Sequence, residues 1–174
     1  MVSPPVSTSI SPEERLKVLK IELPQPPSPL GAYVETVQSG RLLFQSGTLP
    51  IENKKPKYLG TIGKNVTPEE GKQATRLACL NSIAAAKEHL GSLDRVSKVI
   101  RLGVQLVTTS DFKDHAMIAD GASELLLDIF GKERISTRIV VGMATLPLGV
   151  PVVTEIVFEI ADEVIDLAKT NLWR

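Results

Sequence analysis

Residues 96–107, VSKVIRLGVQLV, alternate between apolar and polar side chains over most of their length. One set of alternate positions is apolar and consists of Ile100, Leu102, Val104 and Leu106. The other set consists of Arg101, Gly103 and Gln105. Because successive side chains of an extended chain point to opposite faces, this period of two predicts a half-buried β-strand. The segments on either side of the strand then indicate the fold class.

A long helix is predicted before this strand. Residues 67–70, TPEE, form a capping box, with Thr67 as N-cap, proline in the first turn and Glu70 reaching back. Small and apolar residues follow at spacings of three and four, namely Ala74, Leu77, Ala78, Asn81, Ala85 and Leu90. Gly91 then stands where helices commonly end in the left-handed conformation. The alanines would let this helix lie close against a sheet.

Further elements are predicted on both sides of this pair. Asp111 is expected to cap a second helix that runs to Phe130 and ends at Gly131. The β-branched runs at 138–145 and 152–160 predict two strands. Residues 33–37 and 42–46, separated by turn-forming residues 38–41, predict an antiparallel hairpin. Residues 51–65, rich in Lys, Pro, Gly and Asn, predict a surface loop.

The predicted order ββ, α, β, α, ββ is typical of an α+β fold, a mixed sheet with two helices packed on one face. This arrangement leaves the other face of the sheet without a helix. Strands as apolar as residues 139–143 and 156–158 do not suit a face left in water. We therefore expect subunits to pack sheet against sheet in a homo-oligomer.

The chain divides into three parts. Residues 1–30 are expected to form a tail, a short helix capped at Ser11 and ending near Leu19, and a proline-rich strap. The strap includes PQPPSP at 24–29, which must be extended because each proline bars the preceding residue from helix. Residues 31–161 form the domain proper. Residues 162–174 are a C-terminal tail compatible with a short helix.

The composition argues against several classes of protein. The 174 residues contain 20 Lys and Arg against 20 Asp and Glu, so the basic excess typical of nucleic-acid binding is missing. A single cysteine, Cys79, excludes an internal disulfide, and the two histidines have no zinc-site spacing, so we expect no metal or cofactor. No apolar run reaches the roughly 18 residues of a membrane helix, and no signal peptide is evident at the start. We expect a cytoplasmic protein.

Several short segments, taken in order, resemble the RidA family, also called YjgF/YER057c/UK114. They are Gly31-Ala32-Tyr33-Val34, Phe44-Gln45-Ser46-Gly47, Ala74-Thr75-Arg76 with Leu80-Asn81, Leu93-Asp94-Arg95-Val96, and Ser136-Thr137-Arg138 with Leu146-Pro147. The resemblance covers residues 31–161. The proline-rich lead-in, Asp114-His115 and residues 120–123 are similar to a longer branch, often labelled endoribonuclease L-PSP/chorismate-mutase-like.

The resemblance implies an α+β fold assembled as a homotrimer, with ligand clefts between neighbouring subunits. It also implies hydrolysis of reactive enamines and imines, such as 2-iminobutanoate or 2-iminopropanoate, to 2-oxo acids and ammonia. The imine carbon is already electrophilic, so such a protein mainly has to hold the acid and place a water. The expected partner is a small carboxylic or imino acid.

Arg138 is the strongest candidate for binding that acid. It opens an apolar strand, and its guanidinium matches a carboxylate through two parallel hydrogen bonds. By resemblance it matches the family's substrate-carboxylate arginine, eight residues before Leu146. Spacing alone leaves open an arginine that is solvated or paired with a glutamate.

The resemblance also assigns Tyr33, Ser46 and Gly47 to the lining of the cleft. Taken alone, Tyr33 is equally typical of a packed strand aromatic, and Ser46 and Gly47 of a strand end. Glu35, close by, is interpreted as a solvated surface residue. Cys79, among alanines and leucines, is interpreted as a small buried hydrophobe.

The last strand departs from the family pattern. Many members carry two glutamates there, two residues apart, and the first is thought to orient the attacking water. Here Val153 occupies the first position and only the second, Glu155, is present, ~6.8 Å further along the same face. Glu155 is the catalytic candidate, acting through a water, or it pairs with an arginine of a neighbouring subunit. A thiol that many members carry two residues after the arginine is replaced by Val140.

Three functions are therefore weighed. The first is an imine deaminase. The second is a non-catalytic module that holds a small carboxylate in the same cleft; Val153 favours it, since general-base assistance is typically worth 10²–10⁴-fold. The third is an endoribonuclease, placed last because the chain has no basic surplus and no pair of neighbouring histidines.

Overall fold

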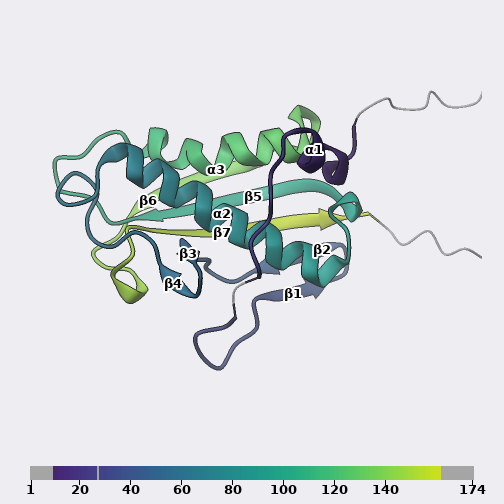
Figure 1. The fold of residues 1–174 in the computed structure, drawn as a ribbon, viewed down its shortest axis with the longest axis horizontal. Coiled ribbons are helices and arrows are strands. Elements are labelled where there is room, and N and C mark those ends of the chain that lie inside the picture. Colours follow the sequence, from purple (N-terminus) through teal and green to yellow (C-terminus); the bar gives the residue numbers. More distant parts are fainter. Residues whose placement is uncertain (1–9, 27, 162–174) are drawn as a thin grey trace, which may run out of the picture.

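The computed structural model describes residues 10–26 and 28–161, and its centre is a five-stranded sheet (Figure 1). The strand order is β1-β2-β7-β5-β6. The strands are β1 (Thr36–Ser39), β2 (Leu42–Gln45), β5 (Val96–Leu106), β6 (Thr137–Gly142) and β7 (Val152–Ile160). β5 and β6 run parallel, and the other neighbours are antiparallel. The sheet is therefore mixed, as predicted.

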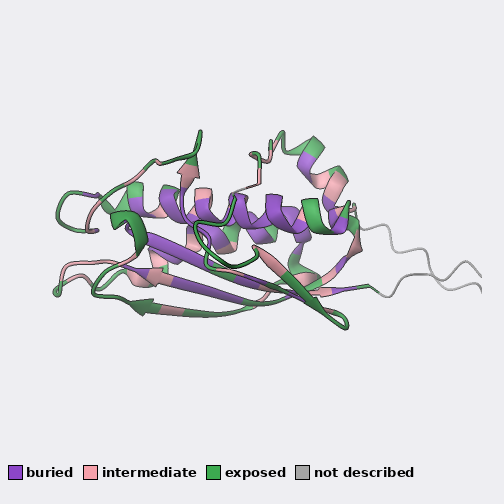
Figure 2. Cartoon of the chain, turned by 90° about the horizontal axis from the view of Figure 1, so that it is seen from below, coloured by how far each residue is buried: buried purple, intermediate pink, exposed green. Residues whose placement is uncertain are grey.

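Two long helices cover one face of this sheet (Figures 1 and 2). They are α2 (Pro68–Leu90) and α3 (His115–Phe130), and a shorter α1 (Pro12–Val18) packs against α3. The core lies between the helices and the sheet, and its largest side chains include Leu43, Ile83, Leu102, Ile118, Ile129, Ile156 and Phe158. Three 3₁₀ turns complete the chain: η1 (Leu93–Arg95), η2 (Lys132–Arg134) and η3 (Pro147–Gly149). The α+β prediction is confirmed.

None of the helices in the described ranges is long and apolar enough to cross a membrane. The predicted helix in residues 162–174 and most of the predicted N-terminal tail lie outside the described residues.

The predicted helix caps differ in quality. At α2 the capping box is complete, because Thr67 Oγ accepts from the Glu70 amide and the Glu70 carboxylate accepts from the Thr67 amide. The Thr67 amide and hydroxyl both donate to the Glu70 carboxylate and lower its pKa. Gly91 ends α2 at φ 76°, in the left-handed region, as predicted. At α1 the Ser11 hydroxyl accepts from Glu14, and the helix ends at Val18.

Three predicted boundaries are wrong. β1 begins at Thr36, so Tyr33 lies in the segment that leads into the strand. α3 begins at His115, because Asp111 instead accepts a hydrogen bond from Thr109 within a turn that precedes the helix. The loop at 51–65 contains a small hairpin of β3 (Ile51–Glu52) and β4 (Lys55–Pro56).

The alternation in β5 is interrupted by a bulge. The pairing of β5 with β7 shifts register between Val99 and Arg101. Val99 is therefore fully buried, while Ile100 is 37% exposed, contrary to the prediction for Ile100. Beyond the bulge Leu102, Val104 and Leu106 face the core as expected. A bulge is defined by the pairing of two strands, so the alternation within one strand does not reveal it.

The sheet face opposite the helices is open in the single chain and partly apolar (Figure 2). Large hydrophobic side chains there are between 38% and 53% exposed, namely Val37, Phe44, Ile139, Val141 and Met143. The prediction of apolar side chains on this face is confirmed for residues 139–143 but is wrong for Ile156 and Phe158, which are fully buried because they belong to the alternate positions of β7 that face the helices. These side chains form two groups, one on β1 and β2 and one at β6. Exposed apolar side chains that gather on one face are typical of a protein–protein contact.

Candidate functional site

Arg138 lies on the edge strand β6, with its side chain on the helix side of the sheet. It pairs in register with Leu102, whose side chain is buried beneath the helices. The Arg138 Nη1 atom donates to Asp120 Oδ1 at 2.6 Å and to Ser123 Oγ at 3.0 Å, both on α3. Three-residue spacing brings Asp120 and Ser123 to one face of that helix. The sequence left open a glutamate partner; the partner in the chain is an aspartate.

The two contacts leave most of the guanidinium available. Both use the same nitrogen, Nη1, and across residues 10–26 and 28–161 no hydrogen bond is found at Nε or Nη2 of Arg138. Its side chain is 27% exposed. A guanidinium fixed along one edge presents the Nε–Nη2 edge, which matches the two oxygens of a carboxylate.

A second candidate region lies beside β1 and β2, at the other end of the strand order. The loop that leads into β1 projects at the bottom of Figure 1 and encloses a recess of about 20 Å³. Its walls include Leu30, Tyr33, Glu35, Gly47, Thr48 and Leu49. The Tyr33 hydroxyl accepts a hydrogen bond from the Leu30 amide at 3.0 Å. The structure thus brings Tyr33 and Gly47 together, as the sequence prediction requires.

Ser46 adjoins this recess through a contact that sequence reasoning missed. Its hydroxyl donates to Glu35 Oε2 at 2.7 Å, and its amide donates to the Glu35 carbonyl at 2.9 Å. Glu35 is half-buried rather than a freely solvated surface residue. Its place two residues after Tyr33, in the segment already assigned to the cleft, is the signal that could have revealed it.

Gly47 and Val153 are in close contact. A Cβ added to Gly47 would lie 3.0 Å from Val153 Cγ1, which is tighter than ordinary van der Waals contact. Val153 is 6% exposed and packs with Leu49 and Val150. The position that carries a glutamate in many RidA proteins is therefore apolar here and closes one side of Gly47.

Glu155 lies apart from both regions. In β7 the alternate residues Thr154 and Ile156 are fully buried, so Glu155 points to the open face of the sheet, where it is exposed. It stands opposite Gly103, and a Cβ added to that glycine would lie 3.6 Å from the Glu155 Cβ. In one chain the structure does not bring Glu155 to Arg138, which faces the helices.

The two candidate regions also do not meet within one chain. In the order β1-β2-β7-β5-β6, the Arg138 strand is the last and the recess adjoins the first two. β7 and β5 lie between them, with neighbouring strands about 4.8 Å apart. One chain therefore carries two separate candidate regions, here called the two candidate half-sites.

The family described as "YjgF/chorismate_mutase-like, putative endoribonuclease" matches residues 13–160. The chain belongs to this family. Protein TCP17 of Trypanosoma cruzi is 36% identical over 146 residues, which cover 83% of this chain and 91% of that protein. The resemblance deduced from the short segments is confirmed.

Solved structures agree with this membership of the YjgF family. A Shewanella oneidensis protein, described as a "putative endoribonuclease", is 35% identical with a TM-score of 0.83, over 86% of this chain and 99% of that one. Atu1372 of Agrobacterium tumefaciens, of unknown function, is 32% identical with a TM-score of 0.78, over 87% and 92%. E. coli TdcF with bound serine shares the fold at 23% identity, with a TM-score of 0.55 over 78% and 93%.

Cys79 behaves as a buried hydrophobe in this family member. It is fully buried on α2, and burial raises the pKa of its thiol to about 12. A thiol with so high a pKa is a poor nucleophile at neutral pH. Within the described part of the chain, no group of three or more His, Cys, Asp or Glu side chains could hold a metal ion.

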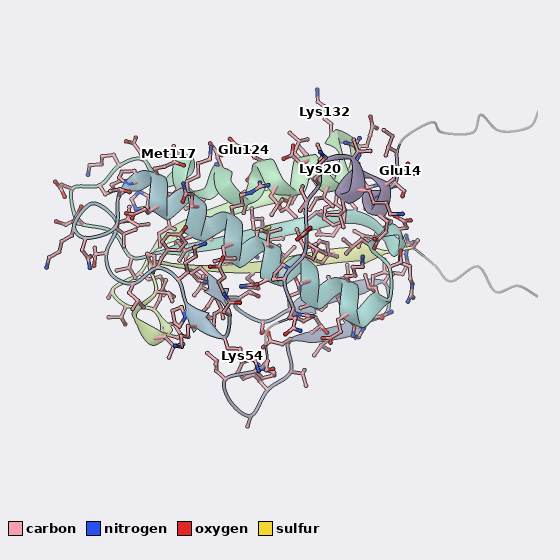
Figure 3. All side chains as sticks on the ribbon, viewed as in Figure 1. Glu14, Lys20, Lys54, Met117, Glu124 and Lys132 are labelled. Carbon is pink, nitrogen blue, oxygen red and sulfur yellow. The ribbon has the colours of Figure 1, made fainter. Side chains whose placement is uncertain are left out.

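A larger hollow lies elsewhere, between α1, the strap that follows it and α2. Its volume is about 830 Å³, and its lining includes Leu16, Lys20, Leu23 and Ala84. Lys20, labelled in Figure 3, lies on the helical side of the molecule. None of the residues predicted for the site lines this hollow.

Proposed function

We propose that the protein hydrolyses small 2-imino acids, such as 2-iminobutanoate and 2-iminopropanoate, to 2-oxo acids and ammonia. The observation that supports this proposal most directly concerns the guanidinium of Arg138. Its Nη1 atom is hydrogen-bonded to α3, and its Nε–Nη2 edge has no hydrogen bond within the described residues. In this proposal that edge binds the substrate carboxylate.

The proposed site forms between subunits of a homotrimer. Arg138 of one subunit would lie beside Tyr33, Ser46 and Gly47 of the next. Two observations support this arrangement: the half-sites are apart in one chain, and the open sheet face exposes large apolar side chains near both of its edges. Packing sheet against sheet would bury that face.

The chemistry needs a placed water and little else. Water adds to the electrophilic C=N carbon, a proton moves to nitrogen, and the C–N bond of the resulting carbinolamine breaks to release ammonia. Glu155 is the proposed carboxylate that orients this water. It is exposed on the open face, and no hydrogen bond or ion pair of its side chain is found in the described residues, so it is available to a neighbouring subunit.

The test is an imine-trapping assay. An amino-acid oxidase generates 2-iminobutanoate, and semicarbazide traps the imine that remains. We expect the wild-type protein to reduce trapping and Arg138→Gln to abolish that effect, while Lys132→Gln, which removes an exposed cation of η2, acts as wild type. Wild-type protein that leaves trapping unchanged would refute the deaminase.

A second function, binding of a small carboxylate without turnover, is favoured by one observation. Val153 packs against Gly47, so the recess has no carboxylate at the position where many RidA proteins carry the water-orienting glutamate. Under this alternative, crystals soaked with pyruvate or 2-oxobutanoate show the anion on Arg138, although wild-type protein does not reduce trapping. Val153→Glu would then introduce activity.

RNA cleavage is placed last. The description of the family includes it, but the equal numbers of acidic and basic residues offer no excess positive charge for binding phosphates.

A further inference from the structure

Glu35 carries a charge that the proposed mechanism does not use. Glu35 is one of the residues that line the recess, together with Tyr33 and Gly47, and its Oε2 atom is held by the Ser46 hydroxyl at 2.7 Å. Over residues 10–26 and 28–161, no hydrogen bond is found at its Oε1 atom and no ion pair at its carboxylate. One oxygen is therefore fixed and the other is free to accept a hydrogen bond.

The size of the recess limits what that oxygen meets. A volume of about 20 Å³ holds one group of the size of water or ammonium, since a single water needs roughly 10–15 Å³. The other residues that line the recess include Leu30, Leu49 and Tyr33. A small cation beside a carboxylate and apolar walls is held more strongly than a neutral group of equal size.

We propose that Glu35 is the subsite for the protonated nitrogen of the ligand, so that the cleft prefers 2-amino and 2-imino acids to 2-oxo acids. This inference rests on the proposed function, which places the carboxylate of the same ligand on Arg138 of the adjoining subunit. The carboxylate of the ligand would then contact the Arg138 cation, and its protonated nitrogen would contact the Glu35 carboxylate.

The assignment has a consequence for the reaction cycle. The protonated imine carries a positive charge on nitrogen, and hydrolysis transfers that nitrogen to ammonium while the carbon becomes a neutral carbonyl. The 2-oxo acid product keeps its contact with Arg138 but loses its contact with Glu35. Substrate is thus held at two points and product at one.

The experiment compares two ligands that differ only at C2. Calorimetric titration at pH 7 measures the affinity of the full-length protein for L-2-aminobutanoate and for 2-oxobutanoate. We expect wild-type protein to prefer the amino acid about 10-fold, the effect of one charge-assisted hydrogen bond. Glu35→Gln should remove this preference by weakening amino-acid binding, because the amide still accepts from Ser46 but has no charge.

A matched control is Glu14→Gln, which removes one negative charge from α1 at the opposite side of the molecule from the recess (Figure 3). This variant should bind both ligands as wild type does. The affinity of Glu35→Gln for 2-oxobutanoate shows whether that variant keeps an intact cleft.

The outcomes separate the two proposals. If the wild-type protein prefers the amino acid but releases no ammonia from imines, the proposed hydrolysis is refuted and the Glu35 subsite is supported. The subsite is refuted if the wild-type protein binds both ligands with equal affinity. It is also refuted if Glu35→Gln loses affinity for both ligands to the same extent, even if the protein is an active deaminase.

Discussion

The two half-sites are built in different ways. Arg138 is positioned by regular elements, a strand on one side and a helix on the other, through Asp120 and Ser123. The recess is positioned by a segment before β1 and a segment after β2, through Tyr33, Glu35 and Gly47. The helical period places Asp120 and Ser123 on one face of α3, which makes the first half-site regular. The second depends on how two irregular segments meet.

The rigid support of the first half-site can be broken at Gly121, on α3 beside Asp120. A Cβ at this glycine would lie 2.2 Å from the Lys72 carbonyl oxygen of α2, so the two helices would have to separate. We expect Gly121→Ala to cost about 3 kcal/mol of stability. For a chain of this length, that corresponds to a melting temperature roughly 6–12 °C lower, measured at fixed protein concentration.

Gly71→Ala is the matched control for that prediction. It is also a helical glycine, but its Cβ would meet the flexible end of Ile62 at 2.9 Å rather than backbone. A melting temperature that falls as far in Gly71→Ala as in Gly121→Ala would mean that helix separation is not the cause.

Arg138 itself gives the next largest effect. We expect Arg138→Gln to lower kcat/KM for 2-iminobutanoate about 100-fold, because a bidentate charged contact is replaced by a neutral one. Steady-state kinetics with varied substrate should assign most of the loss to KM. A loss confined to kcat would contradict a role in binding the carboxylate.

The substitution Gly47→Ala tests the half-site beside β1 and β2, as Gly121→Ala tests the half-site around Arg138. The added Cβ would lie 3.0 Å from Val153 Cγ1, and the surrounding segments are not locked in a helix pair. We expect Gly47→Ala to cost about 1 kcal/mol, less than Gly121→Ala. We also expect Gly47→Ala to lower activity in the trapping assay about 10-fold, because Gly47 lines the recess and must shift to accommodate the methyl group against Val153. Chemical denaturation and the trapping assay measure the two effects; the comparison fails if stability falls and activity does not.

The smallest expected effect is on the pH dependence of stability, through Glu70 in the first turn of α2. The Thr67 amide and hydroxyl lower the pKa of Glu70, so this carboxylate stabilises the fold above its ordinary pKa, and the contribution is lost as pH falls through the lowered value. Glu70→Gln should make the melting temperature depend less on pH between pH 6 and 3. Glu69→Gln, in the same turn, is the control and should keep the wild-type slope.

Much of the fold could be predicted because it depends on local signals. Residue type and spacing predict the β7 range, the capping box at Thr67 and the glycine that ends α2. Asp111 was misassigned because an aspartate caps turns as readily as helices. Ile100 was misassigned because a bulge is a property of the strand pair rather than of one strand.

The candidate site followed the same division. The family resemblance selected Arg138, Tyr33, Ser46 and Gly47, but neither spacing nor resemblance indicated that Asp120 and Ser123 hold the guanidinium. Glu35 was interpreted as a surface residue because its partner, Ser46, is eleven residues away, on the far side of a hairpin.

The sequence by itself determined the order of the elements, the mixed α+β class and the family, because alternation, helical spacing and capping residues act within a few positions along the chain. Only the tertiary structure decided which side chains meet Arg138, where the recess lies, and that the half-sites stay apart in one chain. Those features depend on strand order and on contacts between residues distant in sequence, and no local pattern of residues encodes them.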